Sequence, residues 1–199
     1  TFVVMAREGY GILLADTGLK EIGAKEFIQY KFGSEGIIFA RKRNRLWYAL
    51  DDSGNILFQL PGHPFSGFKE GYAIVKLPDN RQAYINRKGE LAFGEFFIKA
   101  RPFQNGIAYI NTSSGMGIIN NGGAFIVSPK YKYIGPFSEG LAAVQTSSLI
   151  GISNASGNSI LNSGFDYVKL ENAGVFRVEN ADYVGWVSKT GKVIWKPSH

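Results

Sequence analysis

The sequence contains no cysteine in 199 residues, which excludes disulfides, thiolate metal ligands and cysteine nucleophiles. Histidine is almost as scarce, because only His63 and His199 are present. No apolar run approaches the ~18 to 20 residues of a membrane-spanning helix, and no stretch resembles a signal peptide. The first residue is Thr1, so we expect a processed or excised chain. The lack of cysteine leaves the compartment open, with an extracytoplasmic location slightly favoured.

Glycine and aromatic residues are abundant where cysteine and histidine are rare. The chain has 25 Gly, 15 Phe and 10 Tyr, and its apolar positions alternate without helical caps or heptads. Many turns and many aromatic strand residues are typical of an all-β protein. The net charge of +6 is divided evenly, since residues 1–100 and residues 101–199 each carry +3. Neither half is therefore a basic tail.

Two series of glycines recur at a nearly constant spacing. The first series follows Glu or another residue at the start of an apolar run, at positions 36, 71, 106, 140 and 174. The second follows a polar pair, at positions 18, 54, 89, 123, 157 and 191. Aromatic residues precede the first series at Phe32, Phe68, Phe103 and Phe137, where they are expected to fill the core. A period of 34 to 36 residues with turn glycines predicts tandem β-repeats.

One repeat is predicted to contain three strands and an aromatic segment. The fifth unit places strands at residues 141–144, 150–153 and 159–161, and the segment at 165–170 is a candidate fourth strand. The chain is predicted to be one domain of about six β-meander units, and their approximate bounds are 1–32, 33–68, 69–103, 104–137, 138–170 and 171–199. A propeller-like ring is the preferred closure, and an open superhelical array is the alternative. Far-UV circular dichroism should show β structure, with helix content below about a fifth.

The sequences IGPFSEGLAAV at 134–144 and VGWVSKTGKVIWKP at 184–197 resemble the WG, or KWG, β-repeat family of bacterial proteins. The resemblance covers essentially the whole chain and is best in the last three units. The signature pair is altered, because Met116 and Ile150 precede their glycines and the order is reversed at Gly185–Trp186. The resemblance implies a bacterial, non-catalytic repeat scaffold.

The sequence offers little for catalysis. His63 lies in PGHPF, which we interpret as a solvated loop, and two scattered histidines make a zinc site improbable on chemical grounds. Most carboxylates have a structural interpretation, because Glu35, Glu70 and Glu139 recur in the turn slot, where they can accept backbone N–H bonds. The Lys-Thr-Gly string at 189–191 fits a hairpin and not a phosphate loop, which would need a following helix. We therefore expect no enzyme activity, no cofactor and no metal.

One unit departs from the neutral composition of the others. Four cations, Arg41, Lys42, Arg43 and Arg45, precede Trp47 where later units have TSSG or TSSL. Such a cluster can bind an anionic ligand, with Trp47 available for stacking, or serve as a solvated hairpin tip that binds nothing. If it binds, a protein partner is favoured over polysaccharide, and nucleic acid is the least favoured. Replacing all four with Ser is expected to abolish salt-dependent binding without lowering the melting temperature.

The tryptophans, the other aromatic residues and the polar loops are the features that distinguish the competing functions. Trp186 is predicted to pack in the core, whereas Trp47 and Trp195 are left undetermined. A repeated scaffold with variable surface residues favours a protein-interaction module. A carbohydrate-binding or cell-envelope module is the alternative, since the chain has 28 aromatics and neutral polar loops. An enzyme is the third reading and rests only on the general use of all-β rings in catalysis.

Overall fold

The computed structural model describes residues 5–6, 9–10, 12–14, 20–22, 27–31, 34–137, 140–171 and 174–195. Strands, turns and irregular segments make up these residues, and none of them is helical. The all-β prediction is confirmed. Predictions that concern Gly18, Phe32, Glu139, Ala173 and His199 lie outside the described residues, as does the side chain of Trp195.

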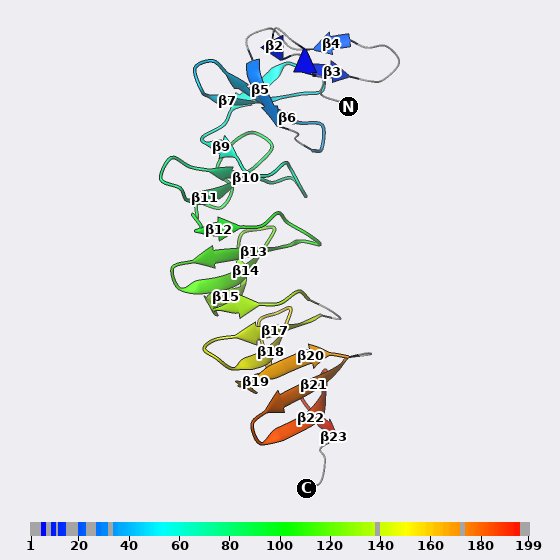
Figure 1. The fold of residues 1–199 in the computed structure, drawn as a ribbon. Coiled ribbons are helices and arrows are strands. Elements are labelled where there is room, and N and C mark those ends of the chain that lie inside the picture. The colour runs from blue at the N-terminus through cyan, green and yellow to red at the C-terminus, as the bar shows by residue number, and fades with distance from the viewer. Residues whose placement is uncertain are drawn as a thin grey trace. The chain divides into compact units, whose positions relative to one another are not determined.

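The strands follow one another as antiparallel meanders, which Figure 1 labels along the chain. The first twelve are β1 (Met5–Ala6), β2 (Gly9–Tyr10), β3 (Ile12–Leu14), β4 (Lys20–Ile22), β5 (Phe27–Lys31), β6 (Ile38–Lys42), β7 (Trp47–Leu50), β8 (Ile56–Gln59), β9 (His63–Pro64), β10 (Ala73–Lys76), β11 (Gln82–Ile85) and β12 (Lys99–Ala100). The others are β13 (Ile107–Thr112), β14 (Gly115–Asn120), β15 (Phe125–Tyr131), β16 (Tyr133–Ile134), β17 (Leu141–Gln145), β18 (Ile150–Asn154), β19 (Ser159–Phe165), β20 (Tyr167–Leu170), β21 (Val175–Asn180), β22 (Tyr183–Ser188) and β23 (Val193–Trp195).

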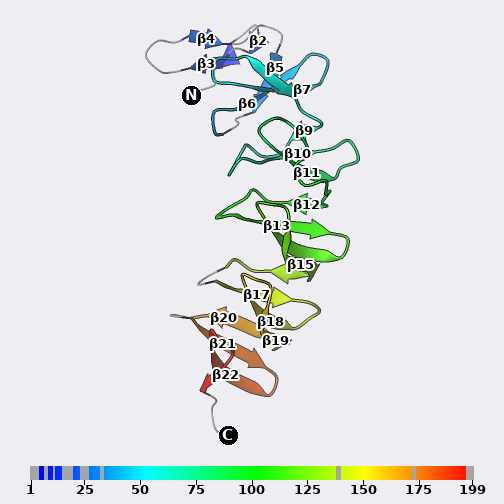
Figure 2. The ribbon, with the colours of Figure 1, turned by 180° about the vertical axis from the view of Figure 1, so that it is seen from behind.

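Four sheets have four strands each, in the orders β5-β6-β7-β8, β12-β13-β14-β15, β16-β17-β18-β19 and β20-β21-β22-β23. The described residues also form a three-stranded sheet, β9-β10-β11, and two-stranded sheets from β1 with β2 and from β3 with β4. The view from behind in Figure 2 shows the hairpin that joins β13 to the following strand. The chain divides into two compact units, Thr1–Ala108 and Tyr109–His199.

The aromatic segment at the end of a sequence unit does form a short strand, and this strand begins the next sheet. In the second compact unit, β16 pairs with β17 through Ile134 and Val144, and β20 pairs with β21 through Val168 and Val178. The strand is thus an outer strand beside the strand that follows the Glu-Gly slot. Each of the three- and four-stranded sheets therefore combines residues of two sequence units, which ties consecutive repeats together covalently and by hydrogen bonds.

The Glu-Gly slots are tight turns in which both central residues are left-handed. Glu70 has φ 53° and Gly71 has φ 84°, while the flanking Lys69 and Tyr72 exchange backbone hydrogen bonds of 2.8 and 3.2 Å. This is the geometry of a type I′ hairpin turn, in which Gly avoids the steric cost of positive φ. Gly140, the glycine of the same slot in the fifth unit, has φ 76°. The predicted turn chemistry is confirmed.

The second glycine series closes polar hairpins of one type. Asn120 Oδ1 accepts the N–H groups of Gly122 and Ala124 at 2.9 and 3.0 Å, and the N–H of Gly123 donates to the Asn120 carbonyl at 2.9 Å. The same bonds are made from the equivalent positions Asp51, Asn86, Asn154 and Ser188. A side-chain acceptor at the first residue of the turn, three residues before the glycine, is the reason that Asp, Asn and Ser recur there.

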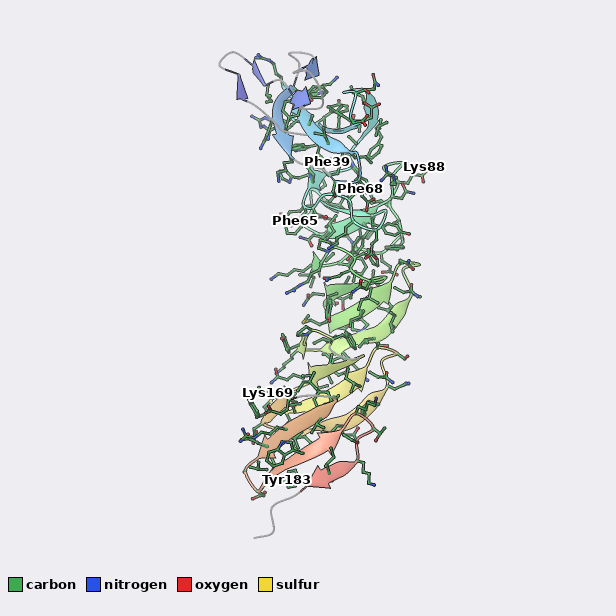
Figure 3. All side chains as sticks on the ribbon, turned by 90° about the vertical axis from the view of Figure 1, so that its right-hand side faces the viewer. Phe39, Phe65, Phe68, Lys88, Lys169 and Tyr183 are labelled. Carbon is green, nitrogen blue, oxygen red and sulfur yellow. The ribbon has the colours of Figure 1, made fainter. Side chains whose placement is uncertain are left out.

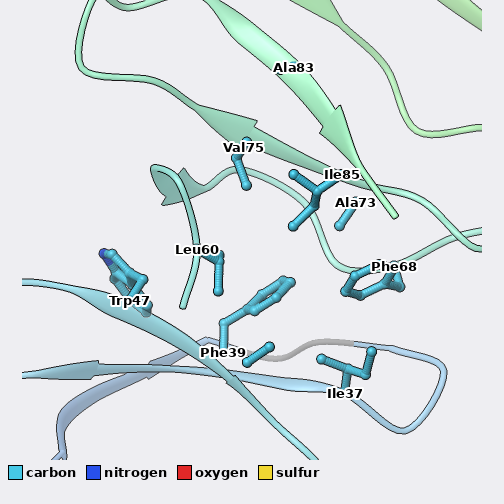
Figure 4. Close-up of a cluster of buried hydrophobic side chains, with 10 residues drawn as sticks. Ile37, Phe39, Trp47, Leu60, Phe68, Ala73, Val75, Ala83 and Ile85 are labelled. Atoms are coloured by element: carbon cyan, nitrogen blue, oxygen red, sulfur yellow. The ribbon is translucent and has the colours of Figure 1, made fainter. Parts of the chain in front are cut away.

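The core of the first compact unit lies between its sheets. Figure 4 shows Phe39, Leu60 and Phe68 in this layer with Val75 and Ile85 opposite them, and each of these side chains is buried. The predicted filling role of the aromatic before each Glu-Gly slot is confirmed at two positions, since Phe68 is 1% and Phe103 0% exposed. Phe137 is half-buried. Burying a large aromatic side chain stabilises the fold by about 1.5 to 3 kcal/mol.

The second compact unit packs its sheets in the same way and adds a close backbone contact. Ile152 of β18 and Val178 of β21 belong to one buried cluster. The polar-hairpin glycine of one repeat lies against the third strand of the previous one, and a Cβ atom at Gly157 would lie only 2.3 Å from the carbonyl oxygen of Ile126. Gly191 stands in the same relation to Ile160, at 2.5 Å. These glycines are required by the approach of the neighbour as well as by their positive φ.

Candidate functional site: the basic hairpin of residues 38–50

The four predicted cations lie on the hairpin formed by β6 and β7. Arg41 pairs with Trp47 in the ladder, and the bend runs from Lys42 to Leu46. The N–H of Lys42 donates to the Leu46 carbonyl at 3.0 Å, and the N–H of Arg45 donates to the Lys42 carbonyl at 3.0 Å. Arg45, the last residue of the bend before Leu46, has a left-handed backbone conformation with φ 68°.

A matching bend in the next sheet shows how unusual Arg45 is. The hairpin of β10 and β11 closes with the same two bonds, from Leu77 to Arg81 and from Asn80 to Leu77. Its left-handed residue is Asn80, with φ 69°. Asn tolerates this conformation, whereas a long side chain such as that of Arg adopts it at a cost of about 1 to 2 kcal/mol. Arg45 therefore stands where the backbone favours Gly or Asn.

The four cations differ in how they are held. Arg43 and Arg45 are exposed. The side chain of Lys42 is half-buried, with Nζ 4.8 Å from the centre of the Tyr48 ring and 5.3 Å from that of Phe27. Arg41 is half-buried as well, and its guanidinium carbon lies 6.0 Å from the centre of the Trp47 ring. The expectation of a uniformly solvated loop is therefore wrong for Arg41 and Lys42, because cation–π contacts hold both.

Trp47 lies beneath the site instead of at its surface. Its side chain is only 4% exposed and belongs to the core cluster of the first compact unit. The interpretation of Trp47 as an open ring for ligand stacking is wrong, because β7 directs this residue into the layer between two sheets. Its position in the ladder, opposite Arg41, matches that of Ile150 opposite Gln145, which is the tryptophan position of the WG signature.

Trp186 is less buried than predicted, in contrast to Trp47. It was predicted to pack in the core, but it is half-buried, whereas its neighbours Gly185 and Val187 are buried. Alternation along β22 places those neighbours toward the core and Trp186 on the other face. The reversed order shifts the tryptophan by two residues from Val184, which pairs with Glu179 as Ile150 pairs with Gln145, and therefore leaves it on the same face of β22.

His63 is also placed differently from the prediction. It is exposed, as expected, but it belongs to strand β9 and pairs with Lys76 of β10. Its ring meets that of Trp47 edge-on at 5.1 Å. Pro64 fits this short outer strand because an edge position needs no N–H donor on its open side. Burial and the nearby Lys31, followed by Arg41 and Lys76, lower the pKa of His63 from its ordinary value.

Two lysines were missed by sequence reasoning, one beside Trp47 and one beside His63. Lys31 Nζ donates to the Pro64 carbonyl at 3.1 Å and lies 5.8 Å from the centre of the Trp47 ring. Lys76 occupies the ladder position in β10 that Arg41 occupies in β6, since it pairs with Gln82 as Arg41 pairs with Trp47. The 35-residue separation of Arg41 and Lys76 was a usable signal for this equivalence.

The recurrent carboxylates bind backbone donors, as predicted. Glu70 accepts hydrogen bonds from the N–H groups of Asn105 and Gly106 at 2.7 and 2.8 Å, so it stabilises the turn of the following repeat. Glu35 accepts from Gly71 N–H at 3.3 Å and pairs with Arg87 at 3.1 Å. Hydrogen bonds from Asn55 lower the pKa of Asp51. Among the described residues, no group of three or more His, Asp or Glu side chains is arranged to hold a metal ion.

These features define a tandem β-repeat protein built of antiparallel meanders. Residues 116–148 match the sequence model of the family described as WG containing repeat. These residues therefore form a repeat of the WG family, and the resemblance found in the sequence is confirmed for this part of the chain. No curated protein sequence matches the chain at a significant level. The described residues include no helix that is long and apolar enough to cross a membrane.

Three solved structures match the chain at low sequence identity. The designed Ika8 protein matches with a TM-score of 0.41 and 13% identity, over 98% of this chain and 69% of its own. BamB from Moraxella catarrhalis matches with a TM-score of 0.42 and 11% identity, over 99% and 75% of the two chains. The WD40 β-propeller domain of Doa1 matches with a TM-score of 0.39 and 13% identity, over 99% and 78%.

Proposed function

We propose that the protein is a non-catalytic bacterial repeat scaffold that binds a protein partner through the basic hairpin of residues 38–50. The observation that carries the proposal is that the periodic residues are used for folding, whereas the residues of the hairpin tip are not. Turn glycines, polar hairpin acceptors and core aromatics recur and are occupied in folding. The hairpin tip does not recur, and it presents Arg43 and Arg45 to solvent. No catalytic residue, cofactor or metal is required by this function.

The conformation of Arg45 supports a binding role for the tip. A left-handed Arg occupies the position that Asn80 holds in the next sheet, although Gly or Asn would relieve the backbone cost. Arg43 and Arg45 form no ion pair with any described carboxylate, whereas the exposed Arg81 pairs with Asp79 at 2.7 Å. Two unpaired guanidinium groups at one tip favour an acidic partner surface.

A carbohydrate-binding or cell-envelope role is the second candidate. The observation that favours it is the exposure of Tyr133 and Tyr167, at 51% and 41%, in equivalent outer strands. The Arg177 guanidinium carbon lies 6.0 Å from the centre of the Tyr167 ring. Exposed tyrosines of this kind can stack on sugar rings.

The test compares the natural chain with an Arg43→Ser/Arg45→Ser variant, which spares the packed Arg41 and Lys42. Both proteins are immobilised, and partner capture from the source cells is measured at low and physiological salt, with heparin retention and a glycan array in parallel. The proposal predicts a protein that the natural chain retains, that salt releases, and that the variant does not capture. Equal capture by both would overturn it, because the overall charge of +6 would then explain the binding. Glycan binding that Tyr133→Ala/Tyr167→Ala abolishes would establish the second candidate instead.

A further inference from the structure

A second group of basic residues lies beside the hairpin, around Trp47 and its neighbour His63. Four elements contribute to it: Lys31 from β5, Arg41 from β6, His63 from β9 and Lys76 from β10. Lys31, Arg41 and His63 all lie within 6.0 Å of the Trp47 ring centre, at 5.8, 6.0 and 5.1 Å. Lys76 pairs directly with His63 in the ladder of β9 and β10.

The cations are held in place by the fold. Lys31 is anchored by its bond to the Pro64 carbonyl, which joins β5 to the first strand of the next sheet. The buried Trp47 supports the Arg41 side chain, whose Nε atom is buried and makes no hydrogen bond with the described residues. None of Lys31, Arg41 and Lys76 forms an ion pair with a described carboxylate. Like charges are thus held together without an internal counter-charge, which favours an external anion.

We propose that Lys31, Arg41, His63 and Lys76 form a site for one carboxylate group of an acidic peptide. The proposal rests on the proposed function, because it identifies the chemistry by which the protein partner is recognised. Three of the four side chains converge on one indole ring and Lys76 adjoins His63 in the ladder, so the arrangement suits one small anionic group more than a polyanion. Arg41 supplies a planar donor, and Lys31 and Lys76 supply ammonium groups.

His63 couples this site to pH. The charged groups that act on it are Lys31, Arg41 and Lys76, all of the same sign, and together with burial they lower its pKa. A bound carboxylate offsets this repulsion and raises the pKa of His63. By linkage, protonation of His63 then strengthens carboxylate binding, so affinity increases as the pH falls through the titration range of the imidazole.

The experiment uses a blocked tetraglutamate peptide as the probe and a tetraglutamine peptide as the uncharged control. The protein carries His199→Gln, so that NMR observes the single imidazole of His63. We expect tetraglutamate to raise the pKa of His63 in a saturable way and to bind more tightly as the pH is lowered from about 8 to about 5. Tetraglutamine should do neither, and His63→Gln should remove the pH dependence of the affinity.

Charge-matched variants locate the site. Arg41→Gln and Lys76→Gln should each weaken tetraglutamate binding about three- to fivefold at low salt, whereas Arg43→Gln and Arg45→Gln, at the tip, should change it by less than about twofold. Lys76 is exposed, so its variant tests the site even if Arg41→Gln alters packing. The inference would be overturned if the Arg43 and Arg45 variants lost as much affinity for tetraglutamate as the Arg41 and Lys76 variants. It would also be overturned if the peptide left the pKa of His63 unchanged. Partner capture that depends on Arg43 and Arg45 would still support the proposed function in that case, which keeps the two failures distinguishable.

Discussion

The hairpins at Ile38–Leu50 and Leu141–Asn154 occupy the same place in their sheets and carry different chemistry. Both join the second and third strands, and Arg41–Trp47 in the first corresponds to Gln145–Ile150 in the second. The first tip holds Arg43 and Arg45, whereas the second reads Thr-Ser-Ser at 146–148. Figure 3 shows the side chains around the first hairpin and the sheet that follows it. Phe39 and Phe68 lie inside, whereas Phe65 and Lys88 point outward. The framework accepts either tip, so the tip is the place to seek function.

The largest effect should come from the framework that both hairpins share. Gly157→Ala places a Cβ atom against the Ile126 carbonyl and imposes positive φ on a residue with a side chain, so we expect destabilisation of roughly 2 to 4 kcal/mol. Gly140→Ala is the matched control, because its φ is 76° but no atom lies within 4 Å of the added carbon. It should cost only about 1 kcal/mol, and Gly140→Val roughly 1 to 3 kcal/mol.

Urea denaturation of these variants separates the contributions. The excess cost of Gly157→Ala over Gly140→Ala measures the contact between consecutive sheets, whereas the cost that they share measures backbone conformation. If the two alanine variants are equally stable, the close approach of the hairpin to the previous sheet contributes nothing, and the proposed reason for Gly157 is wrong.

A smaller effect should come from the carboxylate that links two turns. Glu70→Gln keeps the shape of the side chain but removes the charge that strengthens two short bonds to backbone N–H groups, so we expect a loss of about 1 kcal/mol. Glu95→Gln is the control, since Glu95 is exposed and forms no bond with the described residues. Thermal unfolding should place the melting temperature of the first variant below that of the second. The reverse order would show that the bonds of Glu70 do not contribute.

The third effect should have the opposite sign. Arg45→Gly relieves a left-handed conformation, so we expect a gain in stability of about 0.5 to 1 kcal/mol. Arg43→Gly is the control, because its φ is not positive and the same change there should be neutral or destabilising. Denaturant midpoints check both. A variant that gains stability and loses partner capture would indicate that Arg45 is retained for binding.

The smallest effect should come from removing the exposed charges alone. Arg43→Ser/Arg45→Ser should change the free energy of unfolding by less than about 0.5 kcal/mol, because both side chains are exposed. Arg41→Ser/Lys42→Ser should cost more, since those cations lie over the rings of Trp47 and Tyr48. Calorimetry of the two double variants tests this difference. Equal stabilities would contradict the conclusion that Arg41 and Lys42 are held by the aromatic rings while Arg43 and Arg45 are free of the fold.

The sequence was sufficient for the repeat and insufficient for the environment of individual side chains. Turn glycines and polar acceptors act through bonds that span at most four residues, so their spacing predicted the hairpins around Asn120 and Asn154 correctly. Trp47 and Trp186 were misjudged because burial depends on which face of a strand is covered, and a shift of one residue reverses it. His63 was interpreted as a loop residue because the pairing of β9 with β10 is not local in sequence.

Backbone contacts set the step between consecutive repeats of the second compact unit. Gly157 meets the carbonyl oxygen of Ile126, and Gly191 meets that of Ile160, so main chain faces main chain at these points. At these two points, backbone atoms and not side chains limit how closely the neighbouring sheets approach. Substitutions at signature positions such as Met116 and Ile150 can then be absorbed by local repacking, with the rise per repeat preserved. This would let the aromatic signature change over evolutionary time while the close contact between neighbouring sheets is kept.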